Sequence, residues 1–203
     1  MKYNRRKALN ALLFLCDHLP KPVDVYAAMK VIYFADKCHL ERFGRLMFGE
    51  TYIAMENGPV PSGVYDVIKY VGGRANYDLK FPEAHAALFA TRTELTPKQR
   101  PDLDVFSRSE LQCLIEAARK YGGLSFGQLK RLSHDDAWES ANANGEMDVM
   151  DIARSLMDGD LIAGHLSDRH PGEAAPTAAP DERESRVAAR PEAPEQSEAA
   201  HLH

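Results

Sequence analysis

One carboxylate in the first third of the chain lies where a charge is costly. Residues 24–43 have helical spacing, and on a wheel of about 100° per residue Asp36 falls at the centre of an apolar stripe. The stripe comprises Val25, Met29, Ile32, Tyr33, Leu40 and Phe43, and Asp24 is suited to cap the helix. A buried carboxylate needs hydrogen-bond donors, because an unpaired charge is too costly to bury. We expect Asp36 to be a structural anchor, with contact to a partner as the alternative.

The donors for Asp36 are expected from a turn further along the chain. Residues 57–61, Asn57-Gly58-Pro59-Val60-Pro61, separate a strand-like run at 51–55 from a second helical pattern. Glycine followed by proline is a strong turn signal. We predict that this segment is a turn between strand and helix, and that its backbone N–H groups bind the carboxylate.

Histidines and acidic residues occur together at two points that could imitate an acid–base or metal site. His39 follows Asp36 by three positions, and a helix turns the two side chains about 60° apart. His134 precedes Asp135 and Asp136, a run more typical of helix capping than of acid–base chemistry. We expect His39 to be at the surface or partly buried, and we predict neither a metal site nor a cofactor.

Motifs of the common enzyme classes do not occur in the sequence. There is no G-x-S-x-G nucleophile elbow, and no glycine pair is followed by the Lys-Ser/Thr of a phosphate loop. The cysteines, Cys16, Cys38 and Cys113, are scattered and form no C-x-x-C pair. This pattern is typical of buried thiols in a reducing, cytoplasmic compartment. We predict a cytoplasmic protein without catalytic activity.

The elements that must position these residues follow from periodicity and capping signals. The first helical pattern ends near residue 19, and further ones cover about 24–43, 62–71, 107–121, 125–132 and 147–157. Strand-like runs lie at 51–55 and 87–95. Ser107 with Glu110 and Ser125 with Gln128 have the spacing of capping boxes. The predicted fold is α+β and predominantly helical, with about six helices and a small antiparallel sheet.

Composition divides the chain into a folded body, residues 1–167, and an acidic tail, residues 168–203. The tail has eight acidic residues against four arginines, with five prolines, nine alanines and no aromatic residue, so it cannot bury enough surface to fold. We expect it to be disordered. The body is nearly neutral and has no broad basic field for nucleic acid. No segment approaches the roughly 18 apolar residues of a membrane span.

The order of several markers resembles a known family. The markers are residues 31–36 (Val-Ile-Tyr-Phe-Ala-Asp), His39-Leu40, Gly44, Leu46-Met47-Phe48, Gly58-Pro59-Val60, Val64-Tyr65, Leu132-Ser133-His134 and Trp138. Their succession is similar to the Panacea domain of SocA-like antitoxins and phage-associated proteins, over roughly residues 5–160. Other members often carry Gln at the position of Asp36, so a polar side chain there fits the pattern.

The resemblance implies an antitoxin that binds and neutralises a protein toxin encoded beside it. It also implies a proteolytic adaptor that holds the toxin and presents it to the ClpXP protease. The candidate partner-binding or site-shaping residues are Tyr33, Asp36, His39, Asn57, Gly58, Pro59, Val60, Tyr65, His134 and Trp138. The tail could serve as a tether to the protease, with a plain solubilising role as the alternative.

A DNA-binding regulator that represses its own operon is the alternative function. The helical patterns at 107–121 and 125–132 are joined by a short glycine turn, as in a helix-turn-helix motif. The second carries Lys130 and Arg131, but acidic residues follow at once. Packing of two core helices explains the same residues, so we expect no specific nucleic-acid binding.

Overall fold

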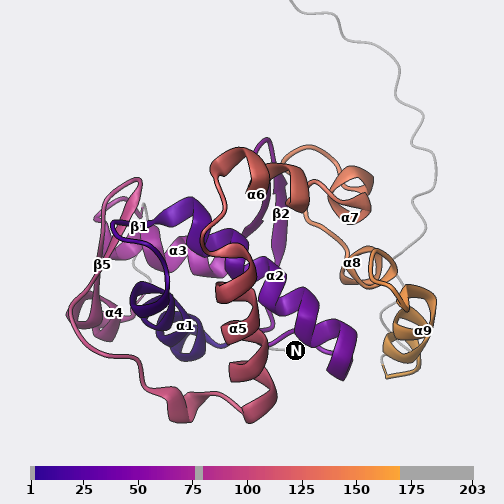
Figure 1. The fold of residues 1–203 in the computed structure, drawn as a ribbon, viewed down its shortest axis with the longest axis horizontal. Helices are drawn as coiled ribbons and strands as arrows, with labels where there is room; N and C mark the ends of the chain where they lie inside the picture. Colours follow the sequence, from indigo (N-terminus) through magenta and orange to yellow (C-terminus); the bar gives the residue numbers. More distant parts are fainter. Residues whose placement is uncertain (1–2, 76–79, 170–203) are drawn as a thin grey trace, which may run out of the picture. The chain divides into compact units, whose positions relative to one another are not determined.

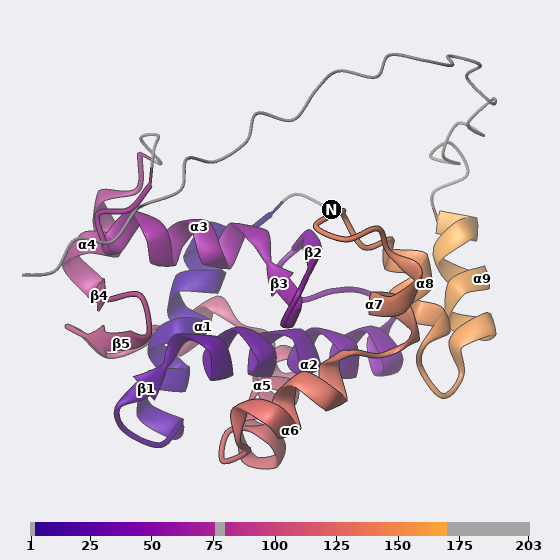
Figure 2. The same cartoon turned by 90° about the horizontal axis from the view of Figure 1, so that it is seen from above.

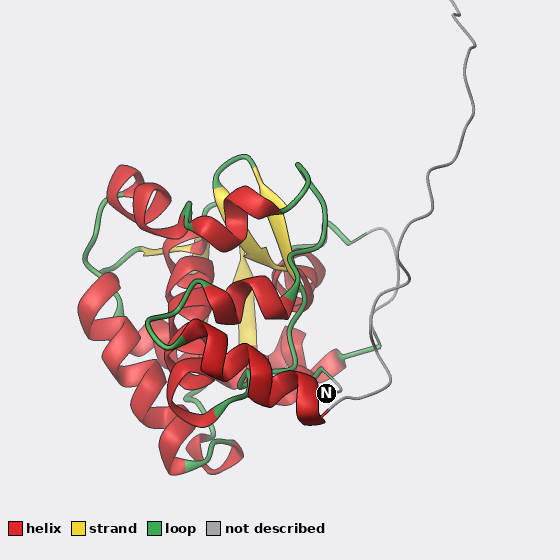
Figure 3. Ribbon diagram, turned by 90° about the vertical axis from the view of Figure 1, so that its right-hand side faces the viewer, coloured by secondary structure: helices red, strands yellow, loops and turns green. Residues whose placement is uncertain are grey.

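The computed structural model describes residues 3–75 and 80–169 of the 203-residue chain (Figure 1). It confirms the predicted α+β class, in which helices dominate and strands form two small antiparallel sheets (Figure 3). In chain order the elements are α1 (Arg5–His18), β1 (Val23–Asp24), α2 (Val25–Phe43), β2 (Tyr52–Met55), β3 (Gly58–Pro61), α3 (Ser62–Val71), α4 (Pro82–Ala87), β4 (Leu88–Ala90), β5 (Glu94–Pro97), the 3-10 helix η1 (Leu103–Val105), α5 (Arg108–Tyr121), α6 (Phe126–Ser133), α7 (Asp136–Ser140), α8 (Val149–Arg154) and α9 (Gly159–Arg169).

Helix α2 is the centre of the fold. Asp24 caps its first turn by accepting a hydrogen bond from the backbone N–H of Ala27, as the sequence predicted, and Gly44 ends it in the left-handed conformation at φ 63°. Every residue from 28 to 36 is buried, so the middle of the helix is covered on all sides rather than along one stripe. In Figure 2, the β2–β3 hairpin and α3 lie on one side of α2, with α5 and α6 on the other.

The predicted strand at 51–55 forms, but its partner was predicted wrongly. It pairs with β3, so that Tyr52 lies opposite Pro61 and Met55 opposite Gly58, and not with the run at 87–95. The turn is confined to two residues, Glu56 and Asn57, which frees the following segment to pair. Residues 144–147 bind the other edge of β2, so β3 is an edge strand, where prolines are tolerated.

The 87–95 run belongs to a separate three-stranded sheet with the order β1-β5-β4. Leu95 lies opposite both Val23 and Ala90 in this sheet. The sheet is completed by β1, two residues directly before α2, which is too short for alternation of apolar residues to reveal.

Helix boundaries follow the sequence most closely where caps define them. Helices α5 and α6 begin with the two predicted capping boxes, each with both reciprocal hydrogen bonds. The described residues contain nine α-helices where about six were expected. Among those not expected, α4 has only six residues, and α9 begins at Gly159, just after the last predicted helical pattern at 147–157. Helix α9 also runs two residues past our domain boundary at 167, and residues 170–203 of the predicted tail lie outside the described residues.

Candidate functional site

Asp36 is held by two hydrogen bonds in the middle of the core. Its side chain is fully buried; Oδ1 accepts from the backbone N–H of Met47 at 2.6 Å and Oδ2 from the hydroxyl of Tyr52 at 2.8 Å. The expected anchor is therefore present, but the prediction that residues 57–60 supply its donors was wrong. The turn at Gly44 brings residue 47 beside the helix instead. Burial raises the pKa of Asp36 to about 7, although both hydrogen bonds favour the charged form.

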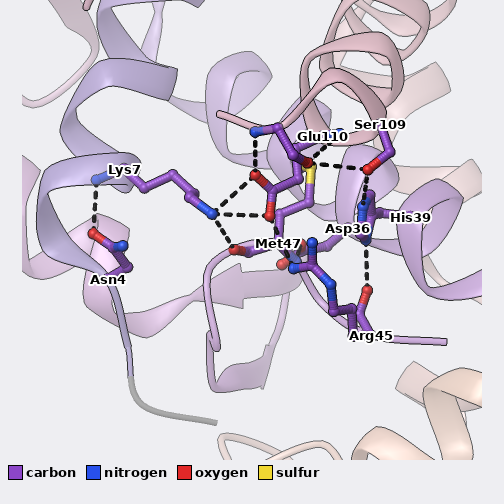
Figure 4. A network of polar contacts seen from close by, with 9 residues as sticks. Asn4, Lys7, Asp36, His39, Arg45, Met47, Ser109 and Glu110 are labelled. Carbon is purple, nitrogen blue, oxygen red and sulfur yellow. Dashed lines mark hydrogen bonds and ion pairs between the residues drawn. The ribbon is translucent and has the colours of Figure 1, made fainter. Parts of the chain in front are cut away.

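A second buried carboxylate, Glu110 on α5, forms an ion network next to Asp36 (Figure 4). Lys7 on α1 donates to both of its oxygens at 2.8 and 2.9 Å, and Arg45 donates to one at 2.8 Å. Burial alone would raise the pKa of Glu110, but these donors and the backbone N–H of Ser107 lower it to about 2. The network therefore joins α1, α5 and the segment that follows α2.

Met47 links Asp36 to Lys7 of the Glu110 network, and His39 lies beside the two carboxylates (Figure 4). His39 is fully buried, contrary to our expectation; its Nδ1 lies 2.8 Å from the carbonyl oxygen of Arg45 and its Nε2 3.1 Å from Oγ of Ser109. The carbonyl oxygen of Met47 accepts from Lys7 at 3.4 Å, while its N–H binds Asp36. The imidazole of His39 and the backbone groups of Met47 thus all have partners inside the fold.

Glu50 is a third buried carboxylate that sequence reasoning missed. Its oxygens accept from the backbone N–H groups of Gly63 at 2.8 Å and Val64 at 3.1 Å, at the start of α3. It therefore supplies the cap that Pro61, the preceding residue, cannot provide. We call Asp36, Glu50 and Glu110 the carboxylate centre.

The other half of α2 contains a buried lysine beneath the β2–β3 hairpin. Lys30 has no exposed surface, and its Nζ donates to the carbonyl oxygen of Pro59 at 2.6 Å. The ring of Tyr26 lies 5.0 Å from the same nitrogen. Burial lowers the pKa of Lys30 to about 7. Sequence reasoning missed this residue, because only its place among buried residues on every side of α2 makes it unusual.

Gly58 allows α6 to approach the hairpin. Its φ of 95° is a conformation that residues with a side chain rarely adopt. A Cβ atom there would lie 2.5 Å from Oγ of Ser133, 3.0 Å from Nζ of Lys30 and 3.2 Å from Cδ2 of His134. Three side chains, one from α2 and two from the end of α6, thus lie close to the Cα atom of Gly58, and only glycine fits between them.

His134 and Trp138 cover this convergence. Their rings stack with centroids 3.6 Å apart, and the indole N–H of Trp138 donates to the carbonyl oxygen of Met55 at 3.0 Å. Nε2 of His134 is buried with no hydrogen-bond partner, and burial lowers the pKa of this imidazole. We call Lys30, Gly58, Pro59, Ser133, His134 and Trp138 the hairpin cluster. It unites two groups of sequence markers that lie about seventy residues apart.

The comparisons with known proteins bear on these markers. The family model for the antitoxin SocA-like, Panacea domain matches residues 29–139, which is more than half of the chain and contains both the hairpin cluster and the carboxylate centre. The chain belongs to this family. No curated protein and no solved structure matches it.

Tyr33 and Asp135 connect the hairpin cluster of this Panacea domain to α8. The hydroxyl of Tyr33 and Nζ of Lys37 both donate to Oδ2 of Asp135, at 2.8 and 2.7 Å, and Lys37 also reaches Ser155. Oδ1 of Asp135 accepts from the backbone N–H of Trp138 and so caps α7. The acidic run after His134 thus acts in helix capping.

Two predicted residues of the Panacea pattern lie apart from the hairpin cluster. Tyr65 is half-buried on α3, where Nζ of Lys69 lies 5.0 Å from its ring, and no hydrogen bond within the described residues links it to the hairpin. Val60 is buried in β3 and belongs to the core. Neither presents a side chain at the tip of the hairpin.

Exposed apolar side chains surround the polar tip of the hairpin. Asn57 is exposed there; its carbonyl oxygen accepts from the hydroxyl of Tyr26 at 3.0 Å and its Oδ1 from Lys130 at 2.9 Å. The rings of Tyr26 and Phe126 contact each other at a tilt of 37°, with centroids 4.6 Å apart, and Phe126 is 54% exposed. Met55 is 38% exposed beside the half-buried Trp138. We call Tyr26, Met55, Asn57, Phe126 and Trp138 the hairpin surface.

Two classes of site are not found in residues 3–75 and 80–169. No helix there has both the length and the apolar character needed to cross a membrane. Within the same ranges, no three His, Cys, Asp or Glu side chains are grouped so that they could hold a metal ion.

Proposed function

We propose that this protein is an antitoxin that binds and neutralises a cognate protein toxin in the cytoplasm, without catalysis of its own. Membership of the SocA-like antitoxin family is the observation that carries the proposal. The buried polar residues support a non-catalytic role, because Asp36, Glu50 and Glu110 all accept hydrogen bonds from groups of the fold.

We place the toxin on the hairpin surface. Large exposed apolar side chains grouped around a backbone turn are typical of protein interfaces, and aromatic residues contribute most to their affinity. Phe126 and Met55 are exposed, while Tyr26 and Trp138 are fixed by hydrogen bonds to the hairpin backbone. A surface held rigid in this way loses little conformational entropy when it binds. It also lies, apart from Tyr26, within the matched segment.

Binding to the product of the neighbouring reading frame tests this placement. The purified full-length chain should bind that protein, and the double variant Phe126→Ala/Met55→Ala should weaken the affinity by about tenfold or more. Phe89→Ala is the matched control, because Phe89 is 46% exposed on β4 in the other sheet. Equal loss of affinity in both proteins, at equal melting temperature, would move the toxin to another surface.

We extend the proposal to delivery of the toxin to the ClpXP protease. An adaptor must hold its substrate and also contact the protease, and two linked weak contacts gain from a high effective concentration. Residues 170–203 are rich in Pro, Ala and charge, and a flexible chain of that length spans on the order of 30 Å. They could therefore tether the protease, while contact through the folded body is the alternative.

Degradation of the toxin by ClpXP and ATP separates these mechanisms. The truncation point lies after Arg169, because α9 includes the buried residues Ile162 and Ala163 and a shorter chain would disturb them. If the tail is a tether, truncation leaves toxin binding intact and slows degradation several-fold. Equal rates for both chains would assign protease contact to the body, and no degradation with either would leave a simple blocking antitoxin.

The alternative, a DNA-binding autorepressor, gains less support from the geometry. Of the two basic residues on α6, Lys130 donates to Asn57 at 2.9 Å, and Leu129 and Ser133 of the same helix are buried. We expect only weak, salt-sensitive retention of a promoter fragment, because non-specific binding depends on phosphate contacts. A tight, sequence-selective shift at physiological salt would favour the repressor.

A further inference from the structure

Two of the three cysteines, scattered in the sequence, meet in the fold. Sγ of Cys38 on α2 lies 2.9 Å from Sγ of Cys113 on α5, and both are thiols. Helices α2 and α5 pack against each other (Figure 1), and the two cysteines lie where these helices meet. Cys16 on α1 is buried as a thiol without such a neighbour.

The two thiols differ in access to solvent. Cys113 is fully buried, whereas Cys38 is only partly buried. Cys38 also lines a groove of about 290 Å³ whose walls come from α2, α5 and α6, with Phe34 and Leu132 among its apolar residues. A small reagent that enters the groove therefore reaches Cys38 first.

A charged side chain of the same groove lies near the two sulfur atoms. Arg42, one turn beyond Cys38, forms a bidentate ion pair with Glu116 on α5 at 3.0 and 2.7 Å and holds a positive charge near both sulfur atoms. Burial raises the pKa of Cys113. Cys113 is thus held as a thiol by burial, whereas Cys38 is the sulfur that a reagent in the groove can reach.

We propose that Cys38 and Cys113 form a reversible disulfide by exchange with a low-molecular-weight disulfide such as oxidised glutathione. The Cys38 thiolate attacks one sulfur of the reagent; its S–S bond breaks and one glutathione leaves as thiolate. Cys113 then loses its proton and attacks the sulfur of Cys38, and the second glutathione leaves. Two protein thiols are oxidised and one glutathione disulfide is reduced to two glutathiones.

The disulfide would connect positions 75 residues apart and fix α2 to α5. A cross-link that closes a long loop restricts the unfolded chain and so stabilises the fold. Disulfides in reducing compartments are usually transient and sense redox state. The pair is therefore a modification site whose oxidation would stiffen the framework beneath the groove. This inference does not depend on the identity of the toxin.

Mass spectrometry of the full-length protein after incubation with oxidised glutathione tests the proposal. The wild type and the control Cys16→Ser should each lose two hydrogens, with the cross-link mapped to Cys38 and Cys113. Cys113→Ser should stop with one glutathione on Cys38, and Cys38→Ser should leave Cys113 unmodified. The oxidised wild type should also melt several degrees higher than the reduced protein, and reductant should reverse the shift.

Three results would overturn the proposal. One is that the folded wild-type protein keeps all its thiols under conditions that oxidise an equimolar model peptide thiol. Another is a cross-link that forms only in denaturant, which would show that the folded geometry prevents it. The third is glutathione on Cys113 in Cys38→Ser, since the buried thiol would then react without the exposed one. Cys38→Ala and Cys113→Ala give the same readouts should either serine variant fail to fold.

Discussion

The two halves of helix α2 bury charged groups in opposite ways. In the carboxylate centre, Asp36, Glu50 and Glu110 each accept two or more hydrogen bonds, many of them from backbone N–H groups. In the hairpin cluster, the buried ammonium group of Lys30 donates one hydrogen bond, and Nε2 of His134 has no partner. The carboxylates of one region are well supplied with donors, whereas the other region leaves hydrogen-bonding capacity unused.

This difference distinguishes a region whose hydrogen-bond contacts are fixed from one whose contacts can change. A saturated network is held in one geometry, because moving any member leaves a buried group unpaired. A cluster with unused hydrogen-bonding capacity can change its contacts at lower cost. The pKa values of Asp36 and Lys30 are both about 7, reached from below and from above. The two regions therefore change charge in the same pH range with opposite effects on stability.

The largest expected effect is the loss of Glu110. Glu110→Ala leaves Lys7 and Arg45 without their shared acceptor in a buried site, so the free energy of unfolding should fall by about 3 kcal/mol. Chemical denaturation at pH 7 measures the change. Glu116→Ala, on the same helix, is the matched control, because the Arg42–Glu116 pair is exposed and should matter little. Similar losses in both variants would mean that the carboxylate centre is not the stabilising region.

The next effect tests the close approach of α6 to the hairpin. Gly58→Ala should cost about 2–3 kcal/mol, because the left-handed backbone is strained and the new methyl group meets Ser133 and Lys30. Gly73→Ala separates the two causes: Gly73 also has a positive φ, of 66°, but a Cβ there meets nothing within 4 Å. Its cost should be about 1 kcal/mol. If the two substitutions lower the free energy of unfolding equally, the crowding around Gly58 does not contribute to the loss of stability.

Local signals in the sequence predicted one region better than the other. The cap at Asp24, both capping boxes and the burial of Asp36 follow from residues within one or two helical turns of each other. The donors of Asp36 come from residues 11 and 16 positions away, and the contact of Pro59 with Lys30 spans 29. Periodicity cannot predict such contacts, because they depend on how the chain turns at Gly44 and at the hairpin.

The pairing of Cys38 with Cys113 is a further example, at a separation of 75 residues. The family markers partly fill this gap, because Gly58-Pro59 and His134 with Trp138 belong to one pattern and lie together in the fold. They did not indicate Lys30 or Glu50, which are buried polar residues outside the markers.

A smaller effect distinguishes the two regions by pH. The folded pKa of Asp36 lies above its unfolded value of 3.8, so its contribution to stability is present below that value and is lost as the pH rises towards 7. Between pH 5 and 7 the wild type should therefore lose on the order of 2 kcal/mol relative to Asp36→Asn. Glu110, with its pKa lowered to about 2, does not interfere above about pH 5. Parallel stability curves would show that Asp36 is charged throughout, with more hydrogen-bond donation than the structure gives it.

The smallest effect concerns Lys30 and has the opposite sign. Its folded pKa of about 7 lies below the unfolded value of 10.5, so its contribution is present above the unfolded pKa and is lost as the pH falls through 7. Between pH 7 and 8 the wild type should gain about 1 kcal/mol relative to Lys30→Met, which keeps the length of the side chain and removes its charge. Lys98→Met is the control, because Lys98 also donates to a backbone carbonyl, that of His85, but in solvent; its curve should run parallel to the wild type. Combined with Asp36, these slopes predict that the two groups together stabilise the fold least near neutral pH. If Lys30→Met and Lys98→Met behave alike, the ammonium group of Lys30 is as well solvated as a surface lysine, and the contrast between the two halves of α2 fails at its basic end.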